Sequence, residues 1–180
     1  MKQYKKQISI IALAIASLVY LGTKSFVFTS DQRSSPKNNT YYTVSRVIDG
    51  DTIVLSDGRR VRLIGIDTPE VYFSAKLLRD SKKSGRDIKT IQGFGKRASA
   101  FTKELCFGKK VILEYDIERY DRYKRTLAYV FLEDGTFVNA KIVQEGFAQV
   151  MTVVPNVKYA NLFLKLQQEA REASRGLWRT

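Results

Sequence analysis

Residues 52–66 read Thr-Ile-Val-Leu-Ser-Asp-Gly-Arg-Arg-Val-Arg-Leu-Ile-Gly-Ile, a pattern of two strands joined by a turn. The runs Thr52–Leu55 and Arg60–Ile66 are rich in the β-branched and apolar residues that favour strands. Asp57-Gly58 lies between them, and this dipeptide is a strong signal for the tight turn of a β-hairpin. The stretch therefore predicts two paired strands.

Further strands are predicted on both sides of this hairpin. Tyr41–Ile48 precedes it, and Lys110–Tyr115 and Thr126–Leu132 follow it, each with the β-branched and aromatic composition of a strand. Asp134-Gly135 comes after the last of them and indicates another turn. The chain thus has five short predicted strands.

Three helices are predicted around these strands. The first has four residues on one face and is ended by Gly108: Ala98, Phe101, Thr102 and Leu105. Asn139 can cap a short second helix that Gly146 ends, and Asn156 can cap a third. We predict an α+β, mainly β fold over residues 41–178: a five-stranded OB-type barrel with about three helices packed outside.

Between Val71 and Gly93 both the strand pattern and the helix pattern lapse. This stretch holds six basic residues and two acidic ones. A loop of this length without regular structure is usually functional or disordered. Its charge suits a phosphate backbone, but a solvated loop has the same composition, and both interpretations stay open.

The composition limits the partners and the kinds of active site that the chain can have. The chain has 31 Lys and Arg residues against 18 Asp and Glu residues, no histidine and one cysteine. The excess of positive charge favours a polyanionic partner such as nucleic acid or an anionic surface. The missing histidines exclude Ser-His-Asp triads and histidine-ligated zinc, and Cys106 is expected to be a core residue. Any metal here should be a hard cation held by oxygen atoms.

The first thirty residues are typical of an export signal. Three lysines precede the uncharged run Ile8–Gly22, which lies between the length of a secretory signal and that of a membrane-spanning helix. We predict that residues 1–30 are a signal peptide or an N-terminal membrane anchor and that 31–40 are a linker. The protein should be exported, and either secreted or anchored to the outer face of the cytoplasmic membrane.

Three clusters contain residues that could carry chemistry. They are Val47–Thr52, Arg62–Glu70 and Asp121–Tyr129. Arg62 lies in an otherwise apolar strand, where a charge must be paired, and Asp67 and Glu70 leave the end of that strand together. Pro69 holds Thr68 extended, so that the Thr68 carbonyl can point to a cation beside Asp67.

In this order, the three clusters resemble those of the staphylococcal nuclease family. The resemblance extends to Ala98–Lys103, Leu127–Tyr129 and Trp178, and so covers nearly all of residues 41–178. The fold it implies is the OB-type barrel that the strand count also predicts. One departure is Lys124, which stands where the prototype of the family has a glycine before the second arginine. Another is the longer loop after Glu70.

The resemblance also implies an active site and an activity. The implied calcium ligands are Asp51, Asp67 and the Thr68 carbonyl, the implied catalytic residues are Arg62, Glu70 and Arg125, and the implied nucleic-acid contacts are Tyr123 and Lys124. The implied activity is that of a calcium-dependent nuclease which cleaves DNA and RNA with little sequence specificity and leaves 3′-phosphate ends. We expect a monomer, with Ca²⁺ as its cofactor.

Two other functions fit parts of the sequence. A noncatalytic OB-type module at the cell surface could bind nucleic acid through basic and aromatic side chains. A basic adhesion domain could bind anionic envelope polymers. Neither of these functions requires the three acidic and two arginine side chains of the implied site to be present together, so their presence favours the enzyme.

Overall fold

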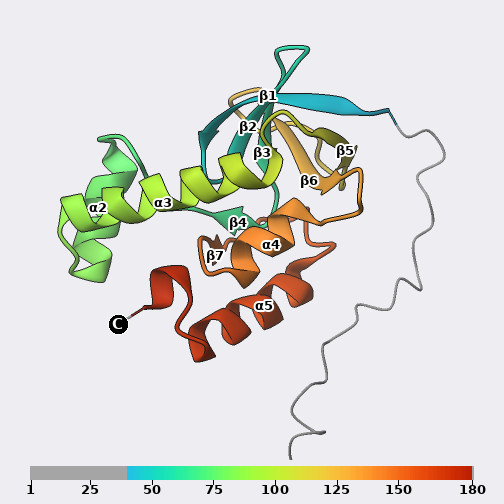
Figure 1. Cartoon of the computed structure of the whole chain (residues 1–180). Helices are drawn as coiled ribbons and strands as arrows, with labels where there is room; N and C mark the ends of the chain where they lie inside the picture. Colours follow the sequence, from blue (N-terminus) through green and yellow to red (C-terminus); the bar gives the residue numbers. More distant parts are fainter. Residues whose placement is uncertain (1–39, 180) are drawn as a thin grey trace, which may run out of the picture. The chain divides into compact units, whose positions relative to one another are not determined.

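The structure is a computed structural model that describes residues 40–179 (Figure 1). The predicted signal or anchor at 1–30, and all but the last residue of the predicted linker at 31–40, lie outside the described residues. Within the described part, no helix is both long enough and apolar enough to cross a membrane.

Five strands form a closed barrel, which confirms the predicted architecture. Their order around the barrel is β1 (Tyr42–Asp49), β2 (Thr52–Leu55), β3 (Arg60–Leu63), β6 (Thr126–Leu132) and β5 (Lys110–Glu114). The β3–β6 pair is parallel and the other pairs are antiparallel. On β3, Arg62 lies opposite Thr52 of β2 and Leu127 of β6, so it sits in the middle of the sheet.

The predicted strand Arg60–Ile66 is broken in two. β3 ends at Leu63, and β4 (Ile66–Asp67) leaves the barrel to pair with β7 (Gln149–Val150). Gly65 makes the break possible, because its φ of 81° lies in the left-handed region and a Cβ there would lie 2.5 Å from the Phe163 ring. This break turns Asp67 away from the line of β3.

The described residues form four α-helices, where about three were predicted. They are α2 (Ala75–Ser84), α3 (Ile88–Cys106), α4 (Val138–Gln144) and α5 (Ala160–Glu172), followed by the short 3₁₀ helix η1 (Gly176–Trp178). α3 packs on β1 and α4, and α4 packs on β6 and α5 (Figure 1). α2 packs on α3 near its N-terminal end.

The prediction that residues 71–93 lack regular structure is wrong. α2 and the first part of α3 occupy most of this stretch. The signals that were overlooked are two N-caps: the Ser74 hydroxyl accepts from the amide of Leu77 at 3.1 Å, and the Asp87 carboxylate accepts from the amide of Thr90 at 2.9 Å. The many basic side chains of this stretch obscure its short apolar pattern. Leu77 belongs to that pattern and is the buried residue of α2.

The predicted caps of the two later helices are also wrong. Asn139 lies inside α4 and is fully buried; its side chain accepts from the Val130 amide and donates to the Ile64 carbonyl, both at 3.0 Å. Asn156 bonds both backbone groups of Glu118, at 2.8 and 2.9 Å, and α5 begins only at Ala160. Both asparagines satisfy backbone groups of other segments, a role that sequence spacing does not show.

The barrel interior and its helical cover form one apolar core. Cys106 is fully buried in it, which confirms the predicted core role, and burial raises the pKa of its thiol to about 12. A thiol in this environment stays protonated and does not act as a nucleophile.

α3 packs closely on the loop that carries Glu70. A Cβ on Gly95 would lie 2.6 Å from the Glu70 carbonyl oxygen and 2.7 Å from that of Pro69. Only a glycine allows this close approach, so α3 sets the position of the loop.

Gly95→Ala should therefore lower the free energy of unfolding by about 1–3 kcal/mol, the usual effect of overpacking. Gly93→Ala is the matched control on the same helix, because nothing lies within 4 Å of a Cβ there. It should raise the stability by up to about 1 kcal/mol, since alanine favours helix more than glycine. Urea unfolding followed by the fluorescence of Trp178 measures both. Equal effects of the two substitutions would contradict the packing argument.

Candidate active site

Arg62 is the centre of the candidate site. It extends from β3, is only 9% exposed, and donates to the carbonyls of Leu63 at 3.1 Å and Ile66 at 2.8 Å. Its Nη1 lies 3.1 Å from Oδ1 of Asp51, and its Nη2 lies 2.9 Å from Oδ1 of Asp67. A buried guanidinium requires such partners, because an unpaired buried charge is strongly destabilising. One arginine thus holds two carboxylates side by side.

The β1–β2 turn and β4 meet at Asp51. Its Oδ2 accepts from the amide of Thr68 at 2.8 Å and from the Thr68 hydroxyl at 3.0 Å. Asp51 and Thr68 are both buried, with exposures of 5% and 4%. The bonds tie the chain after Asp67 to the β1–β2 turn. The structure therefore brings together Asp51, Arg62, Asp67 and Thr68 from three segments of the chain.

A fifth predicted residue, Glu70, joins this group through a lysine that the sequence interpretation did not single out. The Nζ atom of Lys76, on α2, lies 2.9 Å from Oδ1 of Asp67, 3.1 Å from Oε1 of Glu70 and 3.1 Å from the carbonyl oxygen of Thr68. In the sequence, Lys76 is one of six basic residues in its segment, and nothing in its spacing distinguishes it from the others.

The acids around Arg62 lie in a partly buried environment that favours a cation. Asp49 joins them because its carboxylate accepts from the amide of Asp51 at 3.2 Å. Burial raises the pKa of Asp49 to about 7, and the negative charge of Asp51 adds to the shift. Burial also raises the pKa of Asp67, while the positive charge of Lys76 opposes the change. Additional positive charge near these carboxylates would stabilise their ionised forms.

The donor set fits a hard divalent cation. Among residues 40–179, no three or more His, Cys, Asp or Glu side chains gather closely enough to hold a metal ion. The predicted set instead combines the two carboxylates of Asp51 and Asp67 with the carbonyl of Thr68, and Ca²⁺ commonly binds such sets with water in the remaining positions. The Lys76 ammonium lies against two of these three groups, so both of these oxygens already face a positive charge.

Arg125 is presented by a separate turn just before β6. The Asp121 carboxylate accepts from the amides of Tyr123 and Arg125, at 2.8 and 2.9 Å, and from Nε of Arg125 at 2.7 Å. The β3–β6 register pairs Thr126 with Val61, so the turn lies beside the strand of Arg62. In this structure the Arg125 guanidinium contacts Asp121 and the Tyr123 ring, and the structure does not bring it together with Arg62 and Glu70.

Lys124 adopts the backbone conformation for which glycine is favoured. Its φ is 61°, in the left-handed region, and its amide donates to the Asp121 carbonyl at 2.9 Å. A non-glycine residue is less stable in this conformation by about 1 kcal/mol. The bonds to Asp121 hold the turn in spite of this, so the lysine does not abolish it. Asp121 is thus a positioning residue whose role the sequence interpretation missed, although an Asp at the start of a turn, where its carboxylate can bond amides further along, is a usable signal.

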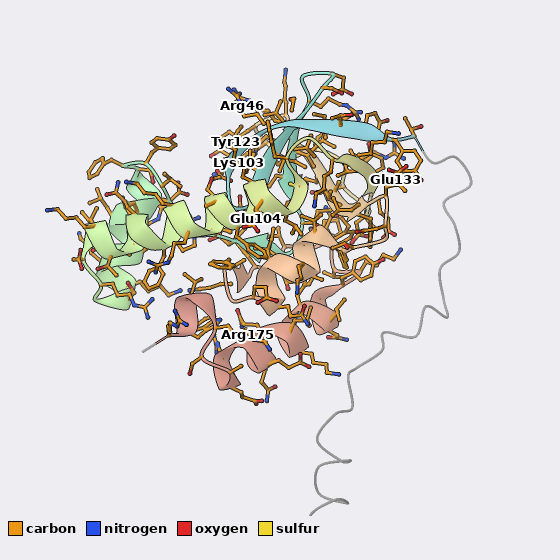
Figure 2. The ribbon with its side chains drawn as sticks, in the orientation of Figure 1. Arg46, Lys103, Glu104, Tyr123, Glu133 and Arg175 are labelled. Atoms are coloured by element: carbon orange, nitrogen blue, oxygen red, sulfur yellow. The ribbon has the colours of Figure 1, made fainter. Side chains whose placement is uncertain are left out.

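The predicted nucleic-acid contacts lie on the surface of the same turn. Tyr123, labelled in Figure 2, is 64% exposed, and the guanidinium groups of Arg122 and Arg125 lie 4.8 and 5.5 Å from its ring centre. Lys124 is exposed beside it. An exposed aromatic ring next to positive charges is suited to stacking on a base whose phosphate is held nearby.

Comparison with known proteins identifies the family of this chain. The family model described as "Staphylococcal nuclease homologue" matches residues 60–180. The chain is 39% identical over 184 residues to a thermonuclease of Staphylococcus intermedius, with 99% of each chain covered. It is 37% identical over 174 residues to a thermonuclease of Staphylococcus hyicus, covering 95% of this chain and 94% of that one. It is also 38% identical over 141 residues to endonuclease YncB of Bacillus subtilis, covering 76% of this chain and 60% of the relative.

The family model covers more than half of the chain, and the two thermonucleases match it almost from end to end. These matches include both the barrel and the turns that carry the candidate site. The chain therefore belongs to the staphylococcal nuclease family and is a nuclease, a hydrolase that acts on nucleic acid.

Proposed function

We propose that this nuclease is a calcium-dependent, exported enzyme that hydrolyses phosphodiester bonds of DNA and RNA with little sequence specificity and leaves 3′-phosphate ends. The observation that carries the proposal is the buried guanidinium of Arg62 between the carboxylates of Asp51 and Asp67. It supports the proposal because two negative groups that would hold a metal ion lie beside a positive group that would hold a phosphate.

Three groups of this chain would hold the calcium ion: the carboxylates of Asp51 and Asp67 and the carbonyl of Thr68. Bound calcium would supply a Lewis acid that draws electron density from the phosphate oxygens. The hydrogen bonds from Thr68 to Asp51 keep the oxygens of the site in place before any ion arrives. This preorganisation favours calcium, whose flexible coordination tolerates mixed carboxylate and carbonyl ligands.

The remaining site residues would act directly on the phosphodiester. Glu70 has a partly exposed carboxylate, which suits it to orient the attacking water and to accept its proton. Arg62 and Arg125 would donate hydrogen bonds to the phosphate oxygens and stabilise the charge that develops in the transition state. Cleavage of the bond between phosphorus and the 5′ oxygen would leave the phosphate on the 3′ end.

The chemistry of the site supports action on both DNA and RNA. The two arginines would bind the phosphate and Glu70 would bind the water, and neither group differs between DNA and RNA. The flat ring of Tyr123 can stack on any base. The 27 basic and 18 acidic residues after residue 30 would attract either polyanion without reading its sequence. A monomer is sufficient, because all proposed site residues come from one chain.

Export is proposed from the N-terminal sequence. The three lysines before the uncharged run Ile8–Gly22 are typical of a chain that is translocated across the cytoplasmic membrane. Outside the cell, calcium reaches concentrations at which a weak oxygen site is filled. A nonspecific nuclease held there would also be kept apart from the genome of its own cell.

Removal of calcium should abolish cleavage. Plasmid DNA and a single-stranded RNA, incubated with the protein, should be degraded with calcium and should stay intact with excess chelator. Magnesium should support little turnover, because its strict octahedron fits a flexible carboxylate and carbonyl set poorly. Full activity in chelator would contradict the calcium assignment.

Arg62→Ala, Glu70→Ala and Arg125→Ala should each lower kcat at least about 10²-fold, the usual loss for one preorganised charge or base. Arg60→Ala is the matched control, because Arg60 is exposed two residues from Arg62 on the same strand. It should leave kcat within about twofold of the wild-type value, as is usual for surface residues. Initial rates at saturating substrate and calcium measure the effect, and circular dichroism confirms the fold of each variant. Normal turnover of the Arg125 variant would remove that residue from the proposed mechanism.

Cell fractionation and N-terminal sequencing test the proposed export. The protein should be recovered from the medium or from the membrane fraction, with the lysines before Ile8 on the inner side when the segment is retained. A released chain that starts between residues 23 and 40 would show cleavage, and a membrane-bound chain that starts at Met1 would show an anchor. Cytoplasmic protein that starts at Met1 would contradict export.

A further inference from the structure

Lys76 has an unusually complete set of acceptors for a lysine on a helix. An ammonium group has three hydrogens to donate, and three oxygens lie within 3.1 Å of Nζ: one each from Asp67, Thr68 and Glu70. The three residues belong to one short stretch, whereas Lys76 comes from α2. The lysine thus joins the start of α2 to the loop of the active site.

The local structure of α2 does not explain why a lysine is found there. Lys76 lies in the first turn of the helix, where the helix dipole disfavours a positive charge and no acidic residue is present. The ion pairs with Asp67 and Glu70 therefore determine where its side chain lies. Lys82, by comparison, is exposed on the same helix and has no such ion pairs among the described residues.

Lys76 and a calcium ion would use the same oxygens. Asp67 and the Thr68 carbonyl are two of the three proposed calcium ligands, and calcium binds oxygen at about 2.3–2.6 Å. The Lys76 ammonium lies 2.9 and 3.1 Å from these two groups. The ammonium lies between these two ligands, in the position that the ion would take, whereas Arg62 reaches Asp67 from β3, beside the carbonyls of Leu63 and Ile66. The ammonium would therefore have to leave before the ion could bind, and Arg62 would not.

We propose that Lys76 is a built-in competitor of the metal ion: it neutralises the acid site when calcium is absent and thereby sets the calcium concentration at which the site fills. The inference rests on the proposed function, because it takes Asp67 and Thr68 as calcium ligands. The flexible four-carbon stem of Lys76 lets the ammonium move to solvent when the ion arrives. Without calcium, the same ammonium holds α2 on the 67–70 loop.

The test measures calcium binding itself, in the absence of substrate. Isothermal titration with calcium is carried out on the wild-type protein, on Lys76→Met and on Lys82→Met. Lys82 is the matched control, because it is an exposed lysine on the same helix and its loss changes the net charge equally. Lys76→Met should bind calcium at least about tenfold more tightly than wild type, as expected when one close competing charge is removed. Lys82→Met should stay within about twofold of wild type, as for a distant screened charge.

Thermal unfolding gives a second readout. With chelator, Lys76→Met should melt below the wild-type protein, since Asp67 and Glu70 lose their shared cation, and calcium should raise its Tm by more than it raises that of wild type. Lys76→Gln keeps a donor for the Thr68 carbonyl without the charge and should change in the same directions. It also provides the test if the methionine variant does not fold.

The calcium-binding results distinguish failure of the Lys76 role from failure of the calcium assignment. Unchanged or weaker calcium binding by both Lys76 variants, with tight binding by wild type, would overturn the competitor role and leave the proposed function intact. Absence of calcium binding by every protein, together with full cleavage in chelator, would overturn the calcium assignment of the proposed function, and the role of Lys76 with it.

Discussion

A guanidinium buried in a β-barrel must be surrounded by acceptors, and this requirement organises the functional end of the molecule. Arg62 satisfies it with the carboxylates of Asp51 and Asp67 and with two backbone carbonyls. An unpaired charge inside the barrel would destabilise the fold by several kcal/mol, so the two acids are held firmly against the guanidinium. The two acids are thereby held on one guanidinium, although they come from different parts of the chain.

Backbone features of the fold make this arrangement possible. Gly65 breaks the strand after Leu63 and directs Asp67 toward the site instead of further along the barrel. Gly95 lets α3 approach the carbonyls of Pro69 and Glu70, which sets the position of the loop beyond Asp67. Asn139 satisfies the Ile64 carbonyl next to the break. The geometry of the candidate site therefore depends on residues that lie outside it.

The barrel could be predicted from the sequence because its signals are local. The Asp57-Gly58 turn and the β-branched runs on either side define two strands without reference to the rest of the chain. Arg62 was recognisable because a charge inside an apolar strand demands a partner. The break at Gly65 could not be recognised from the sequence, because it depends on the ring of a residue in α5. The role of Lys76 could not be recognised either, because its partners come close to it only in the folded protein. Caps such as Ser74 were readable in principle but were obscured by the basic residues around them.

The most direct measurement of the central claim is a crystal structure of the protein grown with calcium, with the ion located by its anomalous scattering. We expect one strong peak bounded by the carboxylates of Asp51 and Asp67 and by the Thr68 carbonyl, with Arg62 still between the two acids. A peak elsewhere with no ion at these groups, or a site that forms only after Arg62 leaves Asp51 and Asp67, would contradict it.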